Sequence, residues 1–113
     1  MDFYVLSSDG LTVYNVTVEM TAGDVRASCT CKAGALGKLC KHQFGILACQ
    51  TDLLASPDNE IKDELRRFVA KISDTACAGL VAEILAADAG IKEYKRRLDS
   101  AKKNLEKALR QHH

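Results

Sequence analysis

The fold of this chain is decided by the stretch Cys29-Thr-Cys-Lys-Ala-Gly-Ala-Leu-Gly-Lys-Leu-Cys-Lys-His42, a Cys-x-Cys pair followed by eight residues and a Cys-x-His pair. Thiolate and imidazole groups bind zinc, and a structural zinc site is closed by four such ligands in a tetrahedron. The candidate ligands are Cys29, Cys31, Cys40 and His42. We therefore predict one structural zinc ion, held by a loop in which Gly34 and Gly37 supply backbone freedom.

Two other interpretations compete with a metal site. The thiols could be buried as small apolar groups, or Cys29 and Cys31 could form a reactive pair. Thioredoxin-like motifs place two residues between their cysteines, however, and a Cys-x-Cys loop is too tight for an easy disulfide. Cys49 and Cys77 fall on apolar helical stripes, which favours a place in the core over metal binding.

Composition indicates an intracellular protein. Five cysteines in 113 residues are an odd number, which does not suit a secreted disulfide framework. No stretch reaches the roughly 20 apolar residues of a membrane span, and the first residues do not resemble an export signal. We expect a cytoplasmic protein, or a nuclear one in a eukaryote, with no membrane partner. His112 and His113 resemble the end of a purification tag and are given no role.

Upstream of the cysteines the sequence predicts a small antiparallel sheet. Residues 3–7 and 11–20 are expected to pair across a tight Asp9-Gly10 turn, a strong hairpin signal. In the second strand, Tyr14, Val16, Val18 and Met20 share one face because side chains alternate along a strand. A turn at 21–24 and a third strand at 25–28 lead directly into the first cysteine pair.

Downstream of the cysteines the apolar spacing predicts helices. A short helix is expected to begin near His42, and a second at Ser56 as N-cap with Pro57 in its first turn. The buried stripe of the second helix is Ile61, Leu65, Phe68, Val69 and Ile72. The sequence leaves open whether residues 73–75 break this helix or continue it.

The last segment carries a heptad seam. Large residues recur every seven positions at Ile84, Ile91, Leu98 and Leu105, and three residues after each stand Ala87, Tyr94, Ala101 and Ala108. This pattern is typical of a coiled coil, although Gly90 weakens the helix by about 1 kcal/mol relative to Ala. The seam either packs on the 57–72 helix as a hairpin or pairs with another chain. The predicted domains are 1–55, which binds zinc, and 56–113, which is helical.

The cysteine stretch resembles the SWIM zinc finger. The ligand spacing agrees, as do the hairpin before it, Lys41 between the last two ligands and the apolar helix after it. The resemblance implies a β-β-α zinc module that serves DNA binding or protein contacts and has no catalytic residues. Thr30 and Leu39 depart from the residues frequent in the family, at positions that do not bind metal. The predicted fold class is α+β, with an antiparallel sheet and ββα finger followed by a helical hairpin or coiled coil.

The charge pattern favours DNA as one partner. Residues 25–51 contain four basic residues, Arg26, Lys32, Lys38 and Lys41, and no acid. Basic side chains on one surface neutralise phosphates and release counterions. Alternatively, the lysines only offset the site's own charge, because zinc with three thiolates and one histidine is formally −1.

A second hypothesis is an adaptor or oligomerisation protein, in which zinc is purely structural and the helical segment binds a partner or another copy. The heptad seam and the acidic stretch 52–91 support it, since neither helps a protein to approach DNA. Catalysis is not expected, because a catalytic zinc keeps one position for water and this site is closed. Apart from the ligands and the terminal pair there is no further histidine, and we expect no small-molecule substrate.

Overall fold

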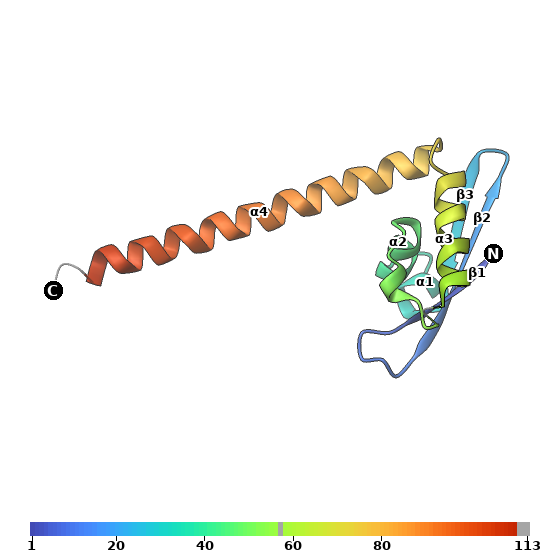
Figure 1. Ribbon diagram of the computed structural model, residues 1–113, viewed down its shortest axis with the longest axis horizontal. Coiled ribbons are helices and arrows are strands. Elements are labelled where there is room, and N and C mark those ends of the chain that lie inside the picture. Colours follow the sequence, from blue (N-terminus) through green and yellow to red (C-terminus); the bar gives the residue numbers. More distant parts are fainter. Residues whose placement is uncertain (57, 111–113) are drawn as a thin grey trace. The chain divides into compact units, whose positions relative to one another are not determined.

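The computed structural model describes residues 1–56 and 58–110, and it has the predicted α+β architecture (Figure 1). Its elements are β1 (Asp2–Leu6), β2 (Val13–Thr21), β3 (Asp24–Cys29), α1 (Lys32–Ala35), α2 (Lys41–Leu47), the 3-10 turn η1 (Thr51–Leu53), α3 (Asn59–Lys71) and α4 (Ala76–Arg110). Contacts divide the chain into two units, Met1–Val81 and the part from Ala82 onward. The first unit includes α3 as well as the sheet, and the domain boundary between residues 55 and 56 stays a prediction.

The sheet is antiparallel with the strand order β1-β2-β3. Its register places Phe3 opposite Val16 and Val16 opposite Cys29, so these three side chains form one row across the sheet. Residues opposite each other on neighbouring strands share a face, and all three are buried. The register therefore brings the first cysteine onto the core face.

The two turns of the sheet differ. The β1–β2 connection runs from Ser7 to Thr12, and the Ser7 N–H donates a hydrogen bond of 2.8 Å to the Thr12 carbonyl. The prediction of a tight Asp9-Gly10 turn is therefore wrong. The loop is wider because the Asp9 carboxylate accepts hydrogen bonds from the Ser7 hydroxyl and the Leu11 N–H, which stabilise this conformation. The β2–β3 turn is the tight one, with φ of 50° at Ala22 and 86° at Gly23, as a type I′ hairpin requires.

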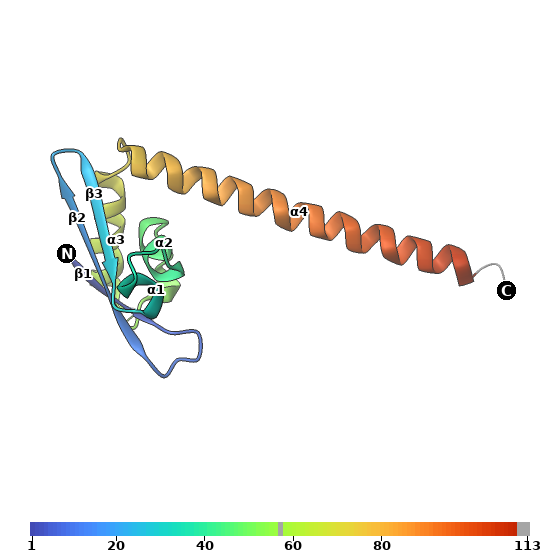
Figure 2. The same ribbon diagram turned by 180° about the vertical axis from the view of Figure 1, so that it is seen from behind.

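The core lies between one face of the sheet and helices α1, α2 and α3, which all lie on that side (Figures 1 and 2). The sheet contributes Phe3, Val5, Val16 and Val18, and the helices with the C-cap of α3 contribute Ile46, Leu47, Leu65, Phe68 and Ile72. The last three belong to the predicted stripe of α3, whose Ile61 and Val69 are half-buried. After η1 the chain returns to the free edge of β1, where the Ala55 N–H donates to the Tyr4 carbonyl at 2.8 Å.

Helix α3 begins later than predicted. Its N-cap is Asp58, whose Oδ1 accepts a hydrogen bond from the Ile61 N–H at 2.9 Å, so Ser56 is not the cap. A carboxylate is favoured there because it also interacts with the positive end of the helix dipole. Pro57, predicted in the first turn, lies outside the described residues.

The helical region is two helices. The hydroxyls of Ser73 and Thr75 donate to the carbonyls of Ala70 and Ile72, which ends α3 and answers the question that the sequence left open. Helix α4 then continues through Gly90 to Arg110. Its seam residues Ile84, Ile91, Leu98 and Leu105 are between 43% and 61% exposed in the single chain. Whether they pack on α3 or on another chain stays a prediction.

Within the described residues, no helix combines the length and the apolar character that crossing a membrane requires.

Candidate metal centre

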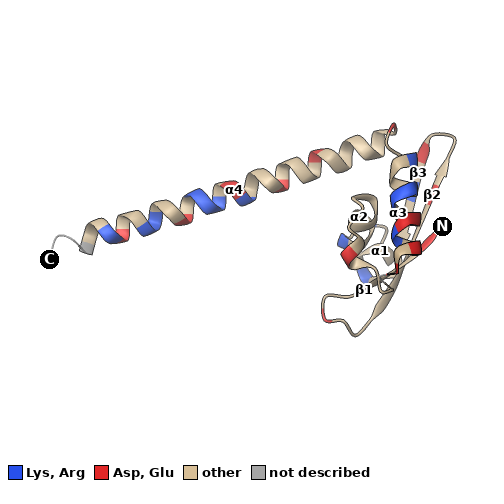
Figure 3. Cartoon of the chain, viewed as in Figure 1, with Lys and Arg blue, Asp and Glu red and all other residues tan. Residues whose placement is uncertain are grey.

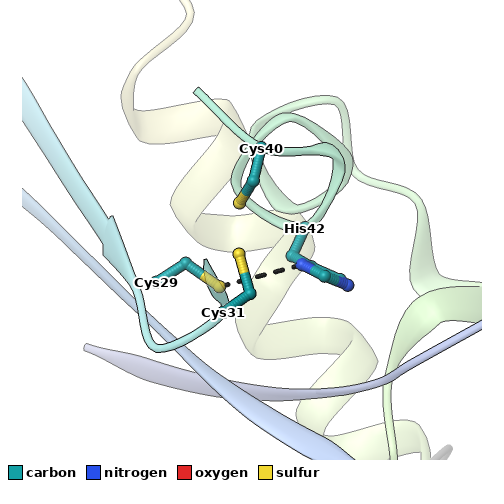
Figure 4. Close-up of side chains that lie close together, drawn as sticks. All are labelled: Cys29, Cys31, Cys40 and His42. Atoms are coloured by element: carbon teal, nitrogen blue, oxygen red, sulfur yellow. Dashed lines mark hydrogen bonds between the residues drawn. The ribbon is translucent and has the colours of Figure 1, made fainter. Parts of the chain in front are cut away.

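Four side chains from the strand end and two helix starts meet in one place (Figure 4). Cys29 is the last residue of β3, Cys31 and Cys40 are the N-caps of α1 and α2, and His42 lies in the first turn of α2. All four are buried, and their candidate ligand atoms lie within 4.8 Å of one another. The structure thus brings together the complete set predicted from the sequence.

Two of the sulfur atoms also cap helices. Sγ of Cys31 accepts the Gly34 N–H, and Sγ of Cys40 accepts the Gln43 N–H, both at 3.3 Å. The Gln43 side chain in turn accepts the Cys40 N–H at 3.4 Å, which completes a capping box. Helix N-caps are usually Ser, Thr, Asp or Asn, so cysteine sulfur takes the place of oxygen here. These N–H donors stabilise the charged thiolates that a metal needs.

Gly34 and Gly37 have different roles in the loop. Gly37 has φ of 75°, the left-handed conformation for which glycine was predicted. Gly34 instead lies inside α1, where a Cβ atom would stand 2.4 Å from the Cys29 carbonyl oxygen. The expectation that Gly34 supplies backbone freedom is therefore wrong: it supplies the space that lets α1 approach the end of β3.

The ring of His42 is oriented for a metal at Nδ1. Nδ1 lies 3.8 Å from Sγ of Cys29 (Figure 4). For zinc bonds of about 2.0 to 2.3 Å, the ligand atoms of a tetrahedron stand about 3.3 to 3.8 Å apart. The ring packs on Tyr14 with centroids 4.8 Å apart, which holds it in this orientation. The donor set and its spacing fit one structural zinc ion.

The electrostatics of the site also suit a cation. Burial raises the pKa of the Cys29 thiol to about 12, because the charged form is poorly solvated there. The Gly34 N–H lowers the pKa of Cys31, and burial lowers that of His42, which favours its neutral imidazole. A bound divalent ion is the charge that would deprotonate the thiols at neutral pH.

The predicted DNA-contact residues lie on two surfaces. Lys32 and Lys41 are the first residues of α1 and α2, Lys38 lies in the loop between them, and all three are exposed. Arg26 stands opposite Glu19 on β2, on the sheet face that points away from these helices. It is therefore separated from the lysines and has an acid beside it.

The structure brings an acid close to one of the lysines. The Lys41 ammonium donates to the Ser8 hydroxyl in the β1–β2 loop. In the same loop, the pKa of Asp9 is lowered chiefly by its hydrogen bond from Ser7 and in smaller part by the charge of Lys41. The sequence of residues 25–51, which has no acid, could not predict that Asp9 lies near Lys41, because Asp9 belongs to the first hairpin.

Sequence reasoning missed two residues that support the site. Gln43 could have been found, since Cys-x-x-Gln has the spacing of a capping box with cysteine in place of serine. Tyr14 is 28 positions before His42 in the sequence, and no local pattern connects them. Cys49 and Cys77 are partly buried against the core and are not part of the metal cluster.

Comparison with known proteins agrees with this geometry. Residues 14–49 match the family model of the SWIM zinc finger. The match begins in β2, ends just after α2 and includes all four clustered side chains. The chain matches no curated protein and no solved structure. Zinc binding by a SWIM-type finger is therefore supported both by the family match and by the cluster.

Proposed function

We propose that the SWIM zinc finger formed by residues 14–49 is a non-catalytic module that binds DNA through the basic side chains around its metal loop. The residues are Lys32, Lys38 and Lys41 at the loop, with Arg26 on the opposite face of the sheet as a fourth candidate. The observation that carries the proposal is the placement of the three lysines. In the sequence they lie beside the ligands or in the loop that connects the two ligand pairs, and all three are exposed. A SWIM finger is in general a binding module and not a catalytic one.

The metal centre would hold these lysines at set positions. Lys32 directly follows Cys31, and Lys41 stands between Cys40 and His42. A zinc ion that fixes the ligands also fixes the backbone from which the lysines project. Lysines that approach a duplex together each neutralise a phosphate and release counterions, which is the sequence-independent part of DNA affinity.

The contributions of the four residues should differ. Within the described part of the chain, Lys32 and Lys38 form no salt bridge, so their charges are available to phosphate. Lys41 already donates a hydrogen bond to Ser8 and interacts electrostatically with Asp9. Arg26, opposite Glu19 on the other sheet face, is the weakest candidate. The proposal therefore rests most on Lys32 and Lys38.

The salt dependence of DNA affinity tests this proposal. The triple Lys32→Gln, Lys38→Gln, Lys41→Gln variant removes the charges at the finger. A matched variant, Lys102→Gln, Lys103→Gln, Lys107→Gln, removes the same charge from exposed positions of α4. Flattening of the salt slope by the first variant alone supports the finger, whereas flattening by the second alone places the DNA contact on α4.

A second candidate function is protein contact through the helical segment. It is favoured by one observation, the exposure of the large apolar residues Ile84, Ile91, Leu98 and Leu105 along α4. Apolar side chains repeated at heptad spacing along a helix form a seam that another helix can cover. In this function zinc stabilises the finger without contributing to recognition.

A further inference from the structure

Helix α4 has an apolar face of unequal side chains. Large residues, Ile84, Ile91 and Leu98, occupy the first position of each heptad, whereas Ala87 and Ala101 occupy two of the fourth positions, with Tyr94 between them. Helix α4 is continuous over this range, so these residues form one stripe along it. The stripe therefore alternates between bulky and small side chains, except at Tyr94 in its centre.

The direction of a partner helix determines how such a stripe packs. In a parallel in-register pair each position faces its own copy, so isoleucine would meet isoleucine and alanine would meet alanine. The alanine layers would then leave gaps, which protein cores avoid. In an antiparallel pair a first position faces a fourth position, so a large side chain meets a small one. The size pattern of α4 favours the antiparallel arrangement.

We propose that α4 pairs with α4 of a second copy of this chain in an antiparallel coiled coil, with the twofold axis between residues 92 and 93. In this register Ile84 faces Ala101, and Leu98 faces Ala87, of the other copy. Ile91 faces Tyr94 in the central layer, where the tyrosine hydroxyl reaches solvent at the edge of the seam. The proposal rests on the second candidate function and names its partner.

Charge along α4 supports the same direction. Between residues 76 and 91 the helix has two acids, Glu83 and Asp88, and no base, whereas residues 92–110 have eight bases and three acids (Figure 3). An antiparallel partner places the basic half of one copy against the acidic half of the other. Such complementary charges at the flanks of a coiled coil set partner and orientation.

The flanking positions make this argument specific. In the proposed register Asp88 lies beside Lys95 of the other copy, twice by symmetry. Asp88 meets Lys92 of its own helix through Oδ2 at 3.2 Å, which leaves Oδ1 for Lys95. In a parallel pair, Glu83 would lie beside Asp88, and Arg97 beside Lys102, so like charges would be adjacent. Such contacts destabilise a helix pair.

Sedimentation equilibrium of the full zinc-loaded chain tests the pairing. We expect a dimer, and we expect Leu98→Asp to make it monomeric, because an unpaired carboxylate would be buried in the seam. The control Ser100→Asp adds the same charge to an exposed residue off the seam and should stay dimeric, and circular dichroism checks that all variants remain helical. A monomeric parent protein, or a dimer that persists in Leu98→Asp, would overturn the proposal.

Crosslinking in a mixture of unlabelled and ¹⁵N-labelled parent protein tests the direction. A zero-length carbodiimide should join Asp88 of one copy to Lys95 of the other, giving a peptide of mixed label. Within one helix these residues are about 10 Å apart along the axis, too far for this reagent. A disulfide formed between copies of a Leu105→Cys variant would instead indicate a parallel pair and reject the register, because only in a parallel pair does this first heptad position face its own copy.

DNA binding by these variants separates the two proposals. Leu98→Asp leaves the finger unchanged, so DNA affinity per finger should be retained when α4 no longer pairs. A monomeric parent that binds DNA would remove the dimer and leave the finger proposal intact. A dimer that binds no DNA would remove the finger proposal and leave the dimer proposal intact.

Discussion

Sγ of Cys29 lies 3.8 Å from Nδ1 of His42, although 13 positions separate the two residues in the sequence. Cys29 ends the edge strand β3, and His42 lies in the first turn of α2. A zinc ion at this point would therefore tie the sheet to the helix that packs on it. The site is a structural connection, and its integrity should determine whether the finger folds.

Loss of a ligand should remove zinc. We expect one equivalent of zinc in the purified protein, and its loss in Cys29→Ser, Cys31→Ser, Cys40→Ser and His42→Ala, measured by atomic absorption. Cys49→Ser and Cys77→Ser are the controls and should retain the metal, since neither belongs to the cluster. Zinc binding contributes about 10 kcal/mol or more to the folding of small zinc domains, so a strong chelator should unfold the finger. Full zinc content in any of the four ligand variants would contradict the assignment.

Substitution of Gly34 should damage the site without touching a ligand. In Gly34→Ala the new Cβ collides with the carbonyl of Cys29, and overpacking of this kind costs roughly 1–3 kcal/mol. We expect lower zinc affinity and a lower midpoint of thermal unfolding. Gly90→Ala is the matched control, because nothing lies within 4 Å of its Cβ position, and it should raise helix stability by about 1 kcal/mol. Equal effects of the two changes would refute the packing argument.

Zinc affinity should fall as the pH falls. In the metal-free protein burial raises the pKa of Cys29 to about 12, so this thiol is protonated at neutral pH and must release its proton when zinc binds. One released proton makes affinity drop about tenfold per pH unit. Burial lowers the pKa of His42, so protonation of the imidazole should add to the slope only below its ordinary value of about 6.5. Competition with a chromophoric chelator between pH 8 and pH 6 measures this, and an affinity independent of pH would exclude it.

Lysine charges at the finger should appear in the salt dependence of DNA binding. Each lost phosphate contact removes about 0.9 from the slope of log affinity against log salt, so the triple finger variant should flatten it by up to about 2.7. Among single variants, Lys32→Gln and Lys38→Gln should act more strongly than Lys41→Gln, whose side chain is engaged with Ser8. Zinc content should not change. If the lysines only balance the thiolates, the triple variant should instead bind DNA as the parent does and lose zinc affinity.

Much of the N-terminal unit could be predicted because its signals are local. The alternation from Tyr14 to Met20 predicts the buried face of β2, on which Val16 and Val18 are fully covered. Spacing alone predicted the four clustered side chains, because Cys-x-Cys and Cys-x-His each place two candidate ligands only two positions apart. The direct path from the third strand into Cys29 was likewise a matter of neighbouring residues.

Other features depended on which of several competing local hydrogen bonds forms. The length of the first turn depended on the hydrogen bonds of Asp9. The start of α3 depended on which of two polar residues, Ser56 or Asp58, caps the helix, and Asp58 does so by accepting the Ile61 N–H. Both alternatives were compatible with turn and cap preferences. Competition between similar local interactions is settled by the surrounding structure, and propensities alone do not rank them.

The sequence by itself determined the metal chemistry of this protein, because zinc selects ligands by residue type and spacing, and both are written along the chain. Only the tertiary structure decided why Gly34 must be glycine and which acid lies near Lys41. These depend on the distance between α1 and the end of β3 and on the meeting of the first hairpin with α2. Close packing sets such distances, and no periodic pattern in the sequence encodes them.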